Sequence, residues 1–428
     1  MCERLQRKSN EHEGIRRLTE SQAAVFSVNL SMHVALVSPA WPLEGNSNGI
    51  VTYVHWLRNG LEKEGCRVSV LAFEVDENCS DPHVYRIDRA DSVRRLLNRV
   101  SGRSSTYDAG YRIAKTLRRL HRSVPIDIVE MEESFGWARK VGTSTRLPLV
   151  VKLHGPAFLH LIDEDLHSPD GRKKVRREGE SLARLPVVIS PSRRHLTETL
   201  SHYGIQPAVA EQVVNPLGLE STVPLWKRTD HDAHVLLFVG RFDRIKGGDS
   251  VILSFRKLLQ QRPHLRLVFV GPDRGLRQPS GEWVGISEFI ATFGDPQLSA
   301  AISVRGTLPP DEICRLRARA ACVIVASRRE SQGYTALEAM LQGCPVVCTD
   351  AYGLDELVRP RVNGMKAKVG DPDDLAQQIS SLLDDASLAE RLGAQARRYV
   401  LEHHDPQKVA KAVIQIYRRT ITMSSRSS

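Results

Sequence analysis

Two glutamates stand eight positions apart in the stretch SRRESQGYTALEAM, residues 327–340. Glu330 follows an apolar run, and Glu338 lies where the pattern predicts the first turns of a helix. Gly333 between them allows a tight turn or a close approach of the backbone to a ligand, and Thr335 or Ser331 could cap the helix. Amides at such a helix start favour an anion. The two carboxylates could therefore flank an anion and accept hydrogen bonds from hydroxyl groups, although solvated helix acids would give the same pattern.

A second stretch, FVGRFDRIKGG at residues 238–248, places two cations at the end of an expected strand. Arg241 emerges at the carboxyl end of that strand, and Lys246 stands just before two glycines. In open α/β sheets, ligands bind in the crevice at the carboxyl ends of the strands. A forked guanidinium and a compact ammonium suit the oxygens of a diphosphate. Taken alone, the same pair also fits an exposed loop without a ligand.

Short apolar strands that alternate with helices must position these residues. In the first half of the chain, runs that predict strands stand at residues 33–39, 67–73, 126–132, 147–155 and 186–192. A second set follows the polar stretch 216–233, at residues 234–240, 265–271, 302–306, 321–327 and 345–350. This alternation predicts an α/β fold with two Rossmann-like, doubly wound parallel sheets.

The length of 428 residues favours two domains over a single core. We expect a polar, disordered leader over residues 1–30, an N-terminal domain over 31–222 and a C-terminal domain over 223–404. An amphipathic helix is expected at about residues 405–421. Because this helix follows both sheets, it could pack back on the N-terminal domain.

The charge pattern argues against a nucleic-acid partner. The net charge is +10, but the excess of Lys and Arg is spread evenly along the chain, without a basic tail. Basic clusters at residues 112–122 and 171–180 are interpreted as solvated helix faces. Contact with an anionic acceptor or a membrane surface is the alternative.

Several other features bear on location and metal binding. No run reaches the length of a membrane span, and the leader lacks the apolar core of a secretory signal. Seven cysteines without a CxxC pair favour reduced thiols in the cytoplasm and no metal site. The motifs GxGxxG, GxxxxGK[ST], HExxH and GxSxG are also missing from the sequence, which argues against dinucleotide, P-loop, zinc-peptidase and serine-hydrolase sites.

At this point the motifs together resemble a known family. The spaced glutamates, with VGRFDRIKGG, PVVISPS, KLHGPAF, GNSNG and NGMKAKVGDPDDLAQQI, are similar to the retaining glycosyltransferases of the GT-B fold, family 4 (glycosyltransferase group 1). The resemblance spans about residues 33–415 in consistent order. It implies two Rossmann-like domains facing a central cleft, the first binding the acceptor and the second a nucleotide-sugar donor.

The resemblance also implies roles for residues of the second domain. Arg241 and Lys246 match the pair that binds the donor diphosphate, and Glu338 matches the carboxylate that holds the ribose. Glu330 matches the acid beside the donor sugar. The backbone that cradles phosphate would come from Gly333, Tyr334 and Thr335.

In the first domain, His154 matches a histidine that contacts the donor sugar, and Asn48 and Gly49 match a loop that covers the diphosphate. Without the family context, His154 would be interpreted as a buried structural residue. A cluster of acids follows the strand at 126–132, and we interpret it as an exposed acidic edge, with acceptor binding or a base as the alternative. These acids are Asp127, Glu130, Glu132 and Glu133.

The chain departs from the family pattern at four positions. Gln332 replaces a common aromatic residue, Thr335 a usual proline and Tyr352 one of two paired glycines. Glu220 stands where an aspartate is frequent. Because every charged position survives, these differences blur the subfamily more than the catalytic competence.

The resemblance implies transfer of a sugar from a UDP-, GDP- or ADP-sugar to a hydroxyl acceptor, with retention, without a required metal and without a cofactor beyond the donor itself. The acceptor could be a small molecule, a glycan or a lipid-linked sugar. We expect a cytoplasmic enzyme with at most peripheral contact to the inner membrane face. The alternatives are an epimerase or phosphorylase on the same fold, or a non-catalytic nucleotide-sugar-binding subunit.

Overall fold

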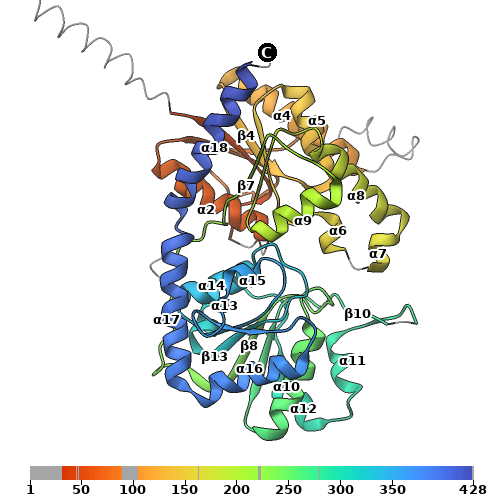
Figure 1. Cartoon of the computed structure of the whole chain (residues 1–428), viewed down its shortest axis with the longest axis vertical. Coiled ribbons are helices and arrows are strands. Elements are labelled where there is room, and N and C mark those ends of the chain that lie inside the picture. Colours follow the sequence, from red (N-terminus) through yellow and green to blue (C-terminus); the bar gives the residue numbers. More distant parts are fainter. Residues whose placement is uncertain are drawn as a thin grey trace, which may run out of the picture.

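The computed structural model describes residues 31–426, apart from 45, 47, 89–104, 162, 220–222 and 279. The leader predicted at 1–30 and Glu220 lie outside the described residues. The chain folds around two separate parallel sheets, stacked along its long axis (Figure 1). The predicted α/β class with two doubly wound sheets is confirmed.

The first sheet has seven strands in the order β3-β2-β1-β4-β5-β6-β7, and every neighbouring pair is parallel. Its strands are β1 (His33–Trp41), β2 (Arg67–Val75), β3 (Val84–Arg86), β4 (Ile128–Glu132), β5 (Leu149–Lys152), β6 (Val187–Ser190) and β7 (Val209–Gln212). The helices around it are α2 (Gly49–Lys63), α4 (Ser105–Ser123), η1 (Ser134–Gly136), α5 (Trp137–Thr145), α6 (Ala157–His160), α7 (Asp163–His167), α8 (Pro169–Leu182) and α9 (Arg193–Tyr203). We call this sheet and its helices the first unit.

The second sheet has six parallel strands in the order β12-β9-β8-β13-β14-β15. They are β8 (Asp232–Val239), β9 (Arg266–Val270), β12 (Ile302–Val304), β13 (Ala320–Val325), β14 (Val346–Thr349) and β15 (Met365–Ala367), with a small hairpin of β10 (Leu276–Arg277) and β11 (Trp283–Val284). Its helices are α10 (Gly248–Gln261), α11 (Ile286–Ala291), α12 (Pro296–Ala301), α13 (Pro310–Arg319), α14 (Tyr334–Gln342), α15 (Leu354–Leu357), α16 (Pro372–Asp384) and α17 (Ala386–His403). These elements form the second unit.

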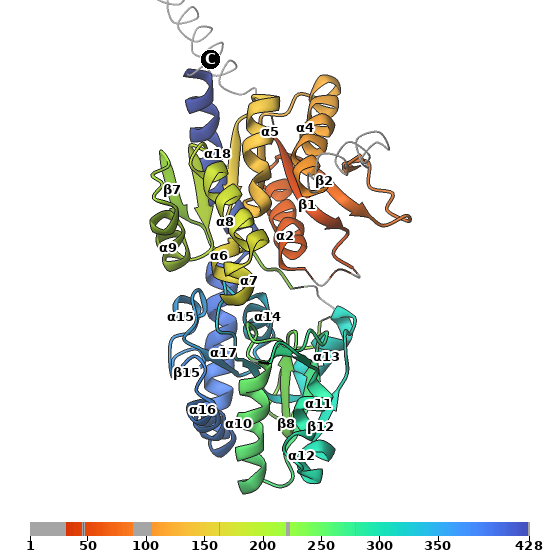
Figure 2. The ribbon, with the colours of Figure 1, turned by 90° about the vertical axis from the view of Figure 1, so that its right-hand side faces the viewer.

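The last helix, α18 (Pro406–Arg426), returns from the second unit to the first and packs against α2. Both views show α17 and α18 running past both units in succession (Figures 1 and 2). The approach is close at Gly60 of α2, where an added Cβ would lie 2.0 Å from the carbonyl oxygen of Pro406. Val409, Val413 and Tyr417 of α18 are buried and pack into the hydrophobic core of the first sheet. The predicted residue boundaries of the two domains stay a prediction.

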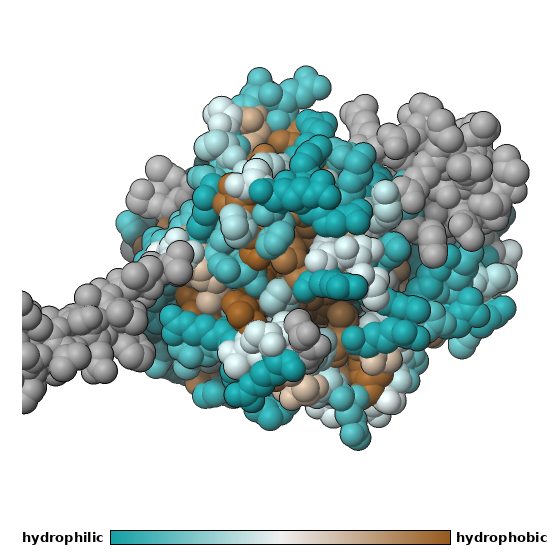
Figure 3. Space-filling model, turned by 90° about the horizontal axis from the view of Figure 1, so that it is seen from above, coloured by the Kyte–Doolittle hydropathy of each residue, from teal (hydrophilic) through white to brown (hydrophobic). Residues whose placement is uncertain are grey.

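The face seen from the end of the first unit mixes polar and apolar side chains among the described residues (Figure 3). Apolar side chains lie there in patches between polar ones (Figure 3). Within the described residues, no helix combines the length and the apolar character needed to cross a bilayer.

Candidate functional site

Two loops at the carboxyl edge of the second sheet bring Lys246 and Glu330 together. Lys246 follows β8 and Glu330 follows β13, which lies beside β8 in the sheet. The Lys246 ammonium donates to the Glu330 carboxylate, which also accepts from Ser327 Oγ at 3.2 Å. Gly247 makes this approach feasible, because its φ of +72° and a Cβ position only 2.0 Å from the Ala326 carbonyl oxygen exclude a side chain.

The ion pair sets the charge of Glu330. This side chain is only 9% exposed, and burial alone would raise the pKa of its carboxyl group. The attraction and hydrogen bond of Lys246 outweigh burial, so the net pKa of Glu330 lies below its ordinary value. A cation and an ionised carboxylate therefore face each other in a partly buried place.

Arg241 lies on the same loop as Lys246 but points to a different partner. Its Nε donates to Asp243 Oδ2 at 2.6 Å, and its side chain is 44% exposed. Asp243 Oδ1 also accepts the Lys246 amide at 2.7 Å, so this aspartate shapes the loop that carries both cations. The exposed Arg241 is free of the Lys246–Glu330 pair and available to an incoming anion.

Helix α14 begins at the position where the sequence predicted an anion-binding helix start, but its cap differs from the prediction. Gly333 is the N-cap, with φ +79°, and no described side chain caps the helix start. Thr335 lies inside the helix and Ser331 lies two residues before the cap, so the prediction that one of them caps the helix is wrong. Gly333 occupies the cap position because the chain turns there with a positive φ, and a threonine with that φ would strain the backbone. The first amides of α14 are therefore left to other acceptors.

Glu338 lies farther along α14 and already has a partner. Its carboxylate accepts from Arg317 Nη2 of α13, and Arg317 is 4% exposed whereas Glu338 is 32% exposed. The buried guanidinium holds the carboxylate near the helix surface with part of it open to solvent. One turn earlier, Tyr334 Oη donates to the Pro216 carbonyl at 3.2 Å.

Gly49 of the first unit lies close to the start of α14, and Asn48 directly precedes Gly49. Asn48 caps α2 by accepting from the Ile50 amide at 2.9 Å. The position of a Cβ on Gly49 lies 3.5 Å from Tyr334 Cδ2. The glycine loop of the first unit thus touches the first residue of α14.

His154 lies at the carboxyl end of β5 in the first unit. Its ring meets Tyr53 edge to face, with centroids 4.9 Å apart. Its amide donates to Glu133 Oε2 at 2.9 Å, and the Gly155 amide donates to Glu133 Oε1 at 2.6 Å. Burial, with Lys152 nearby, holds the pKa of His154 well below its ordinary value. The imidazole is therefore neutral at physiological pH.

The interpretation of an exposed acidic edge is wrong for three of the four acids. Glu130, Glu132 and Glu133 are 2%, 6% and 1% exposed, whereas Asp127 is exposed. Glu130 accepts from Tyr53 Oη at 2.6 Å and Tyr417 Oη at 2.8 Å. Burial, followed by repulsion from Glu133, raises the pKa of Glu132 to about 7. These carboxyls are buried because hydroxyl and amide donors from other elements satisfy them.

Sequence reasoning missed three titratable residues of the first unit whose pKa values burial shifts. Lys152 is fully buried and donates to the Val213 carbonyl, and burial lowers the pKa of its ammonium group. Burial, followed by Glu133, raises the pKa of Glu178 to about 8. Burial lowers the pKa of His160 to about 4; the Glu330 carboxylate opposes this shift, and Lys246 and Arg241 add to it. Isolated charged residues in apolar strands or basic helices were the only sequence signal.

Two of the departures from the family pattern lie at the contact between the units. Gln332 accepts from the Asn215 amide at 2.6 Å and donates to the Pro191 carbonyl at 3.2 Å. Tyr352 lies under the Arg194 guanidinium, 4.1 Å from its ring centroid, and Arg194 also pairs with Asp355 at 2.8 Å. Gln332 and Tyr352, which differ from the family pattern, therefore make contacts between the two units.

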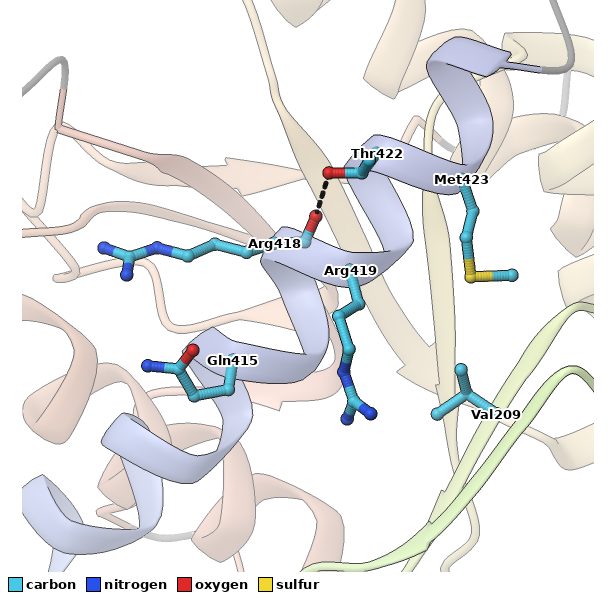
Figure 4. Close-up of a pocket in the computed structure, with 6 residues that line it drawn as sticks. All are labelled: Val209, Gln415, Arg418, Arg419, Thr422 and Met423. Carbon is cyan, nitrogen blue, oxygen red and sulfur yellow. Dashed lines mark hydrogen bonds between the residues drawn. The ribbon is translucent and has the colours of Figure 1, made fainter.

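A separate groove of about 460 Å³ lies between β7 and the end of α18 (Figure 4). Its lining residues are Val209, Gln415, Arg418, Arg419, Thr422 and Met423. Val209 is the first residue of β7, so the groove lies at the amino edge of the sheet. The residues discussed above lie at the carboxyl edges, and we place the candidate site there.

Comparisons with known proteins find two family models that match the chain. Residues 227–399 match the family described as Glycosyl transferases group 1, and residues 47–220 match Glycosyltransferase Family 4. A D-inositol 3-phosphate glycosyltransferase of Nocardioides sp. is 26% identical over 424 residues, which cover 91% of this chain and 89% of the relative.

Solved structures share the architecture. The sucrose-phosphate synthase of Thermosynechococcus elongatus matches with a TM-score of 0.69 and 21% identity, over 92% of this chain and 100% of that chain. The Anabaena protein Alr3699/HepE, solved in complex with UDP and glucose, matches with a TM-score of 0.63 and 18% identity, over 91% of this chain and 100% of that chain. These likenesses concern the fold.

Proposed function

This chain belongs to glycosyltransferase family 4, the group 1 glycosyltransferases, and has the GT-B fold. From that premise we propose that it transfers a sugar from a nucleoside diphosphate sugar to a hydroxyl group of an acceptor, with retention at the anomeric carbon. The family and the fold predicted from the sequence are both confirmed. The second unit would bind the donor, and the first unit would bind the acceptor.

The observation that carries the proposal is the Lys246–Glu330 pair beside an uncapped helix start. The ammonium supplies positive charge for a diphosphate, and the amides of α14 supply hydrogen-bond donors for the same anion. Exposed Arg241 would turn from Asp243 to the diphosphate. Partly exposed Glu338 would accept from the ribose hydroxyls while Arg317 holds it in place.

In the proposed reaction, the bond between the anomeric carbon and the leaving phosphate oxygen breaks and its electron pair stays on the diphosphate. Lys246, Arg241 and the α14 amides would stabilise the charge that develops there. The acceptor hydroxyl would form the new bond on the same face of the sugar and give its proton to the leaving phosphate. Neutral His154 and ionised Glu330 would bind hydroxyl groups of the sugar from opposite sides.

The first substrates to test follow from the relatives. The name of the Nocardioides relative suggests a phosphorylated cyclitol as one acceptor, and the UDP of the Anabaena complex suggests a uridine donor. Guanosine and adenosine donors, and glycan or lipid-linked acceptors, belong in the same screen. We place the enzyme in the cytoplasm, at most peripherally on the inner membrane face.

Thermal unfolding with UDP, GDP and ADP tests the donor site directly. At 100 times its dissociation constant, the correct nucleotide should stabilise the fold by about 3 kcal/mol, which corresponds to several degrees in Tm. We expect the same shift in EDTA, because Lys246, Arg241 and the helix amides would balance the diphosphate charge. No shift with any of the three nucleotides would contradict the proposed site.

A further inference from the structure

One contact between the two units lies directly beside Glu330, the carboxylate proposed to bind the donor sugar. Arg329, the residue before Glu330, donates from Nη1 to the Leu161 carbonyl at 2.8 Å and to the Leu159 carbonyl at 3.3 Å. Both carbonyls belong to the end of α6 in the first unit, which lies on the face that meets the second unit (Figure 2). The loop that positions Glu330 is thus tied to a first-unit helix.

The start of the same first-unit segment is held by two buried carboxyl groups. Glu133 accepts the amides of His154 and Gly155 at 2.9 and 2.6 Å. Glu178 accepts the Ala157 amide at 2.7 Å and the Phe135 amide at 3.2 Å. The segment from His154 onwards therefore starts on a fixed support within its own unit.

Inside the segment, His160 folds back on the loop that carries His154. A Cβ on Gly155 would lie 2.5 Å from both Cδ2 and Nε2 of the His160 ring. The end of α6 therefore packs directly on the residue after His154. A shift at the end of α6 moves the support of His154 rather than a distant loop.

We propose that Arg329 is a positioning residue that couples closure of the two units to the placement of His154 opposite the Lys246–Glu330 pair. The proposal rests on the proposed function. Arg329 would act through Leu159 and Leu161, without touching the substrate. With the units closed, the segment 154–161 would cover the donor sugar and keep water from it.

A second contact between the units provides the control. Arg194 pairs with Asp355 at 2.8 Å and lies over Tyr352, and its amide donates to Glu356 Oε1 at 2.7 Å. This contact joins α9 to α15 and does not include the segment 154–161. If catalysis required only that the two units stay in contact, loss of Arg329 or of Arg194 would lower kcat equally.

The test compares Arg329→Ala, Arg329→Lys and Arg194→Ala in the full chain. For the donor found in the thermal screen, kcat of transfer, donor KM and the share of donor lost to hydrolysis are measured. We expect Arg329→Ala to lower kcat by about 10- to 100-fold, to raise the hydrolysed share and to change KM by less than about threefold. Arg329→Lys should recover part of kcat, because one ammonium can still reach a carbonyl. Arg194→Ala should stay near the wild type in kcat and in hydrolysed share.

Hydrogen exchange gives a readout that needs no substrate. Peptides covering residues 154–161 should exchange faster in Arg329→Ala than in the wild type, and at the wild-type rate in Arg194→Ala. Unchanged exchange in Arg329→Ala, or equal losses of kcat in both alanine variants, would overturn the inference. A wild-type protein that consumes no nucleotide sugar would instead refute the proposed function, whatever the exchange shows.

Discussion

Replacing Lys246 by alanine should lower sugar transfer by about two to three orders of magnitude and leave the fold intact. The ammonium is the cation that the structure places against Glu330, next to the open amides of α14. Removing one such electrostatic group from a closed site typically costs about 3–4 kcal/mol in the transition state. We therefore expect kcat/KM to fall by about 10²- to 10³-fold, while circular dichroism stays unchanged.

Lys257→Ala is the matched control for that loss. Lys257 also pairs with a carboxylate, Asp373, but both side chains are well exposed, at 46% and 74%. Exposed ion pairs contribute little to the stability of the fold, and Lys257 lies outside the candidate site. This variant should therefore transfer sugar at the wild-type rate. Wild-type turnover in Lys246→Ala would refute the diphosphate assignment.

Replacing Glu330 by glutamine should have the second largest effect. The amide keeps the shape of the side chain but removes the negative charge that faces Lys246 and, as we propose, binds the donor sugar. We expect kcat to fall by about 10²-fold. The double variant with Lys246→Ala should lose less than the two single losses combined, because the residues act on one site. Strictly additive losses would mean that the two residues act independently.

The same variant should change stability at acidic pH. The pKa of Glu330 lies below its ordinary value in the folded protein, so the ionised pair stabilises the fold above the unfolded pKa of about 4.3. This contribution is lost as the pH falls through the lower, folded pKa. The wild type should therefore lose more Tm than Glu330→Gln between pH 6 and pH 3. Parallel pH curves for the two proteins would contradict this reasoning.

The sheets could be predicted because their central strands are continuous apolar runs buried on both faces. β3, β7 and β15, which are three or four residues long and lie at sheet edges, escaped prediction, whereas β12, equally short and also at an edge, was predicted at residues 302–306. The sequence of β7, VAEQ, is half exposed and carries no such run. Edge strands gain their structure from the neighbouring strand, which a local pattern does not show.

The motifs at the carboxyl edges were found for a similar reason. Glycines and charges next to apolar strands are local signals, and Lys246 and Glu330 do meet in the structure. The buried state of Glu130 was missed because its partners are distant in sequence. Tyr53 is 77 positions away and Tyr417 is 287 positions away. The packing of α2 and α18 on the first sheet brings these hydroxyls to the carboxylate.

The anomeric configuration of the sugar released from the donor tests the central claim most directly. The wild-type protein is incubated with UDP-, GDP- and ADP-glucose, each α-configured, with water as the acceptor and with Lys246→Ala as the control. Proton NMR at early times then identifies the glucose anomer before it equilibrates. We predict that one of the three donors yields α-glucose and that Lys246→Ala releases it at least about 100-fold more slowly. Early β-glucose, or no consumption of any of the three donors, would contradict retaining transfer at this site.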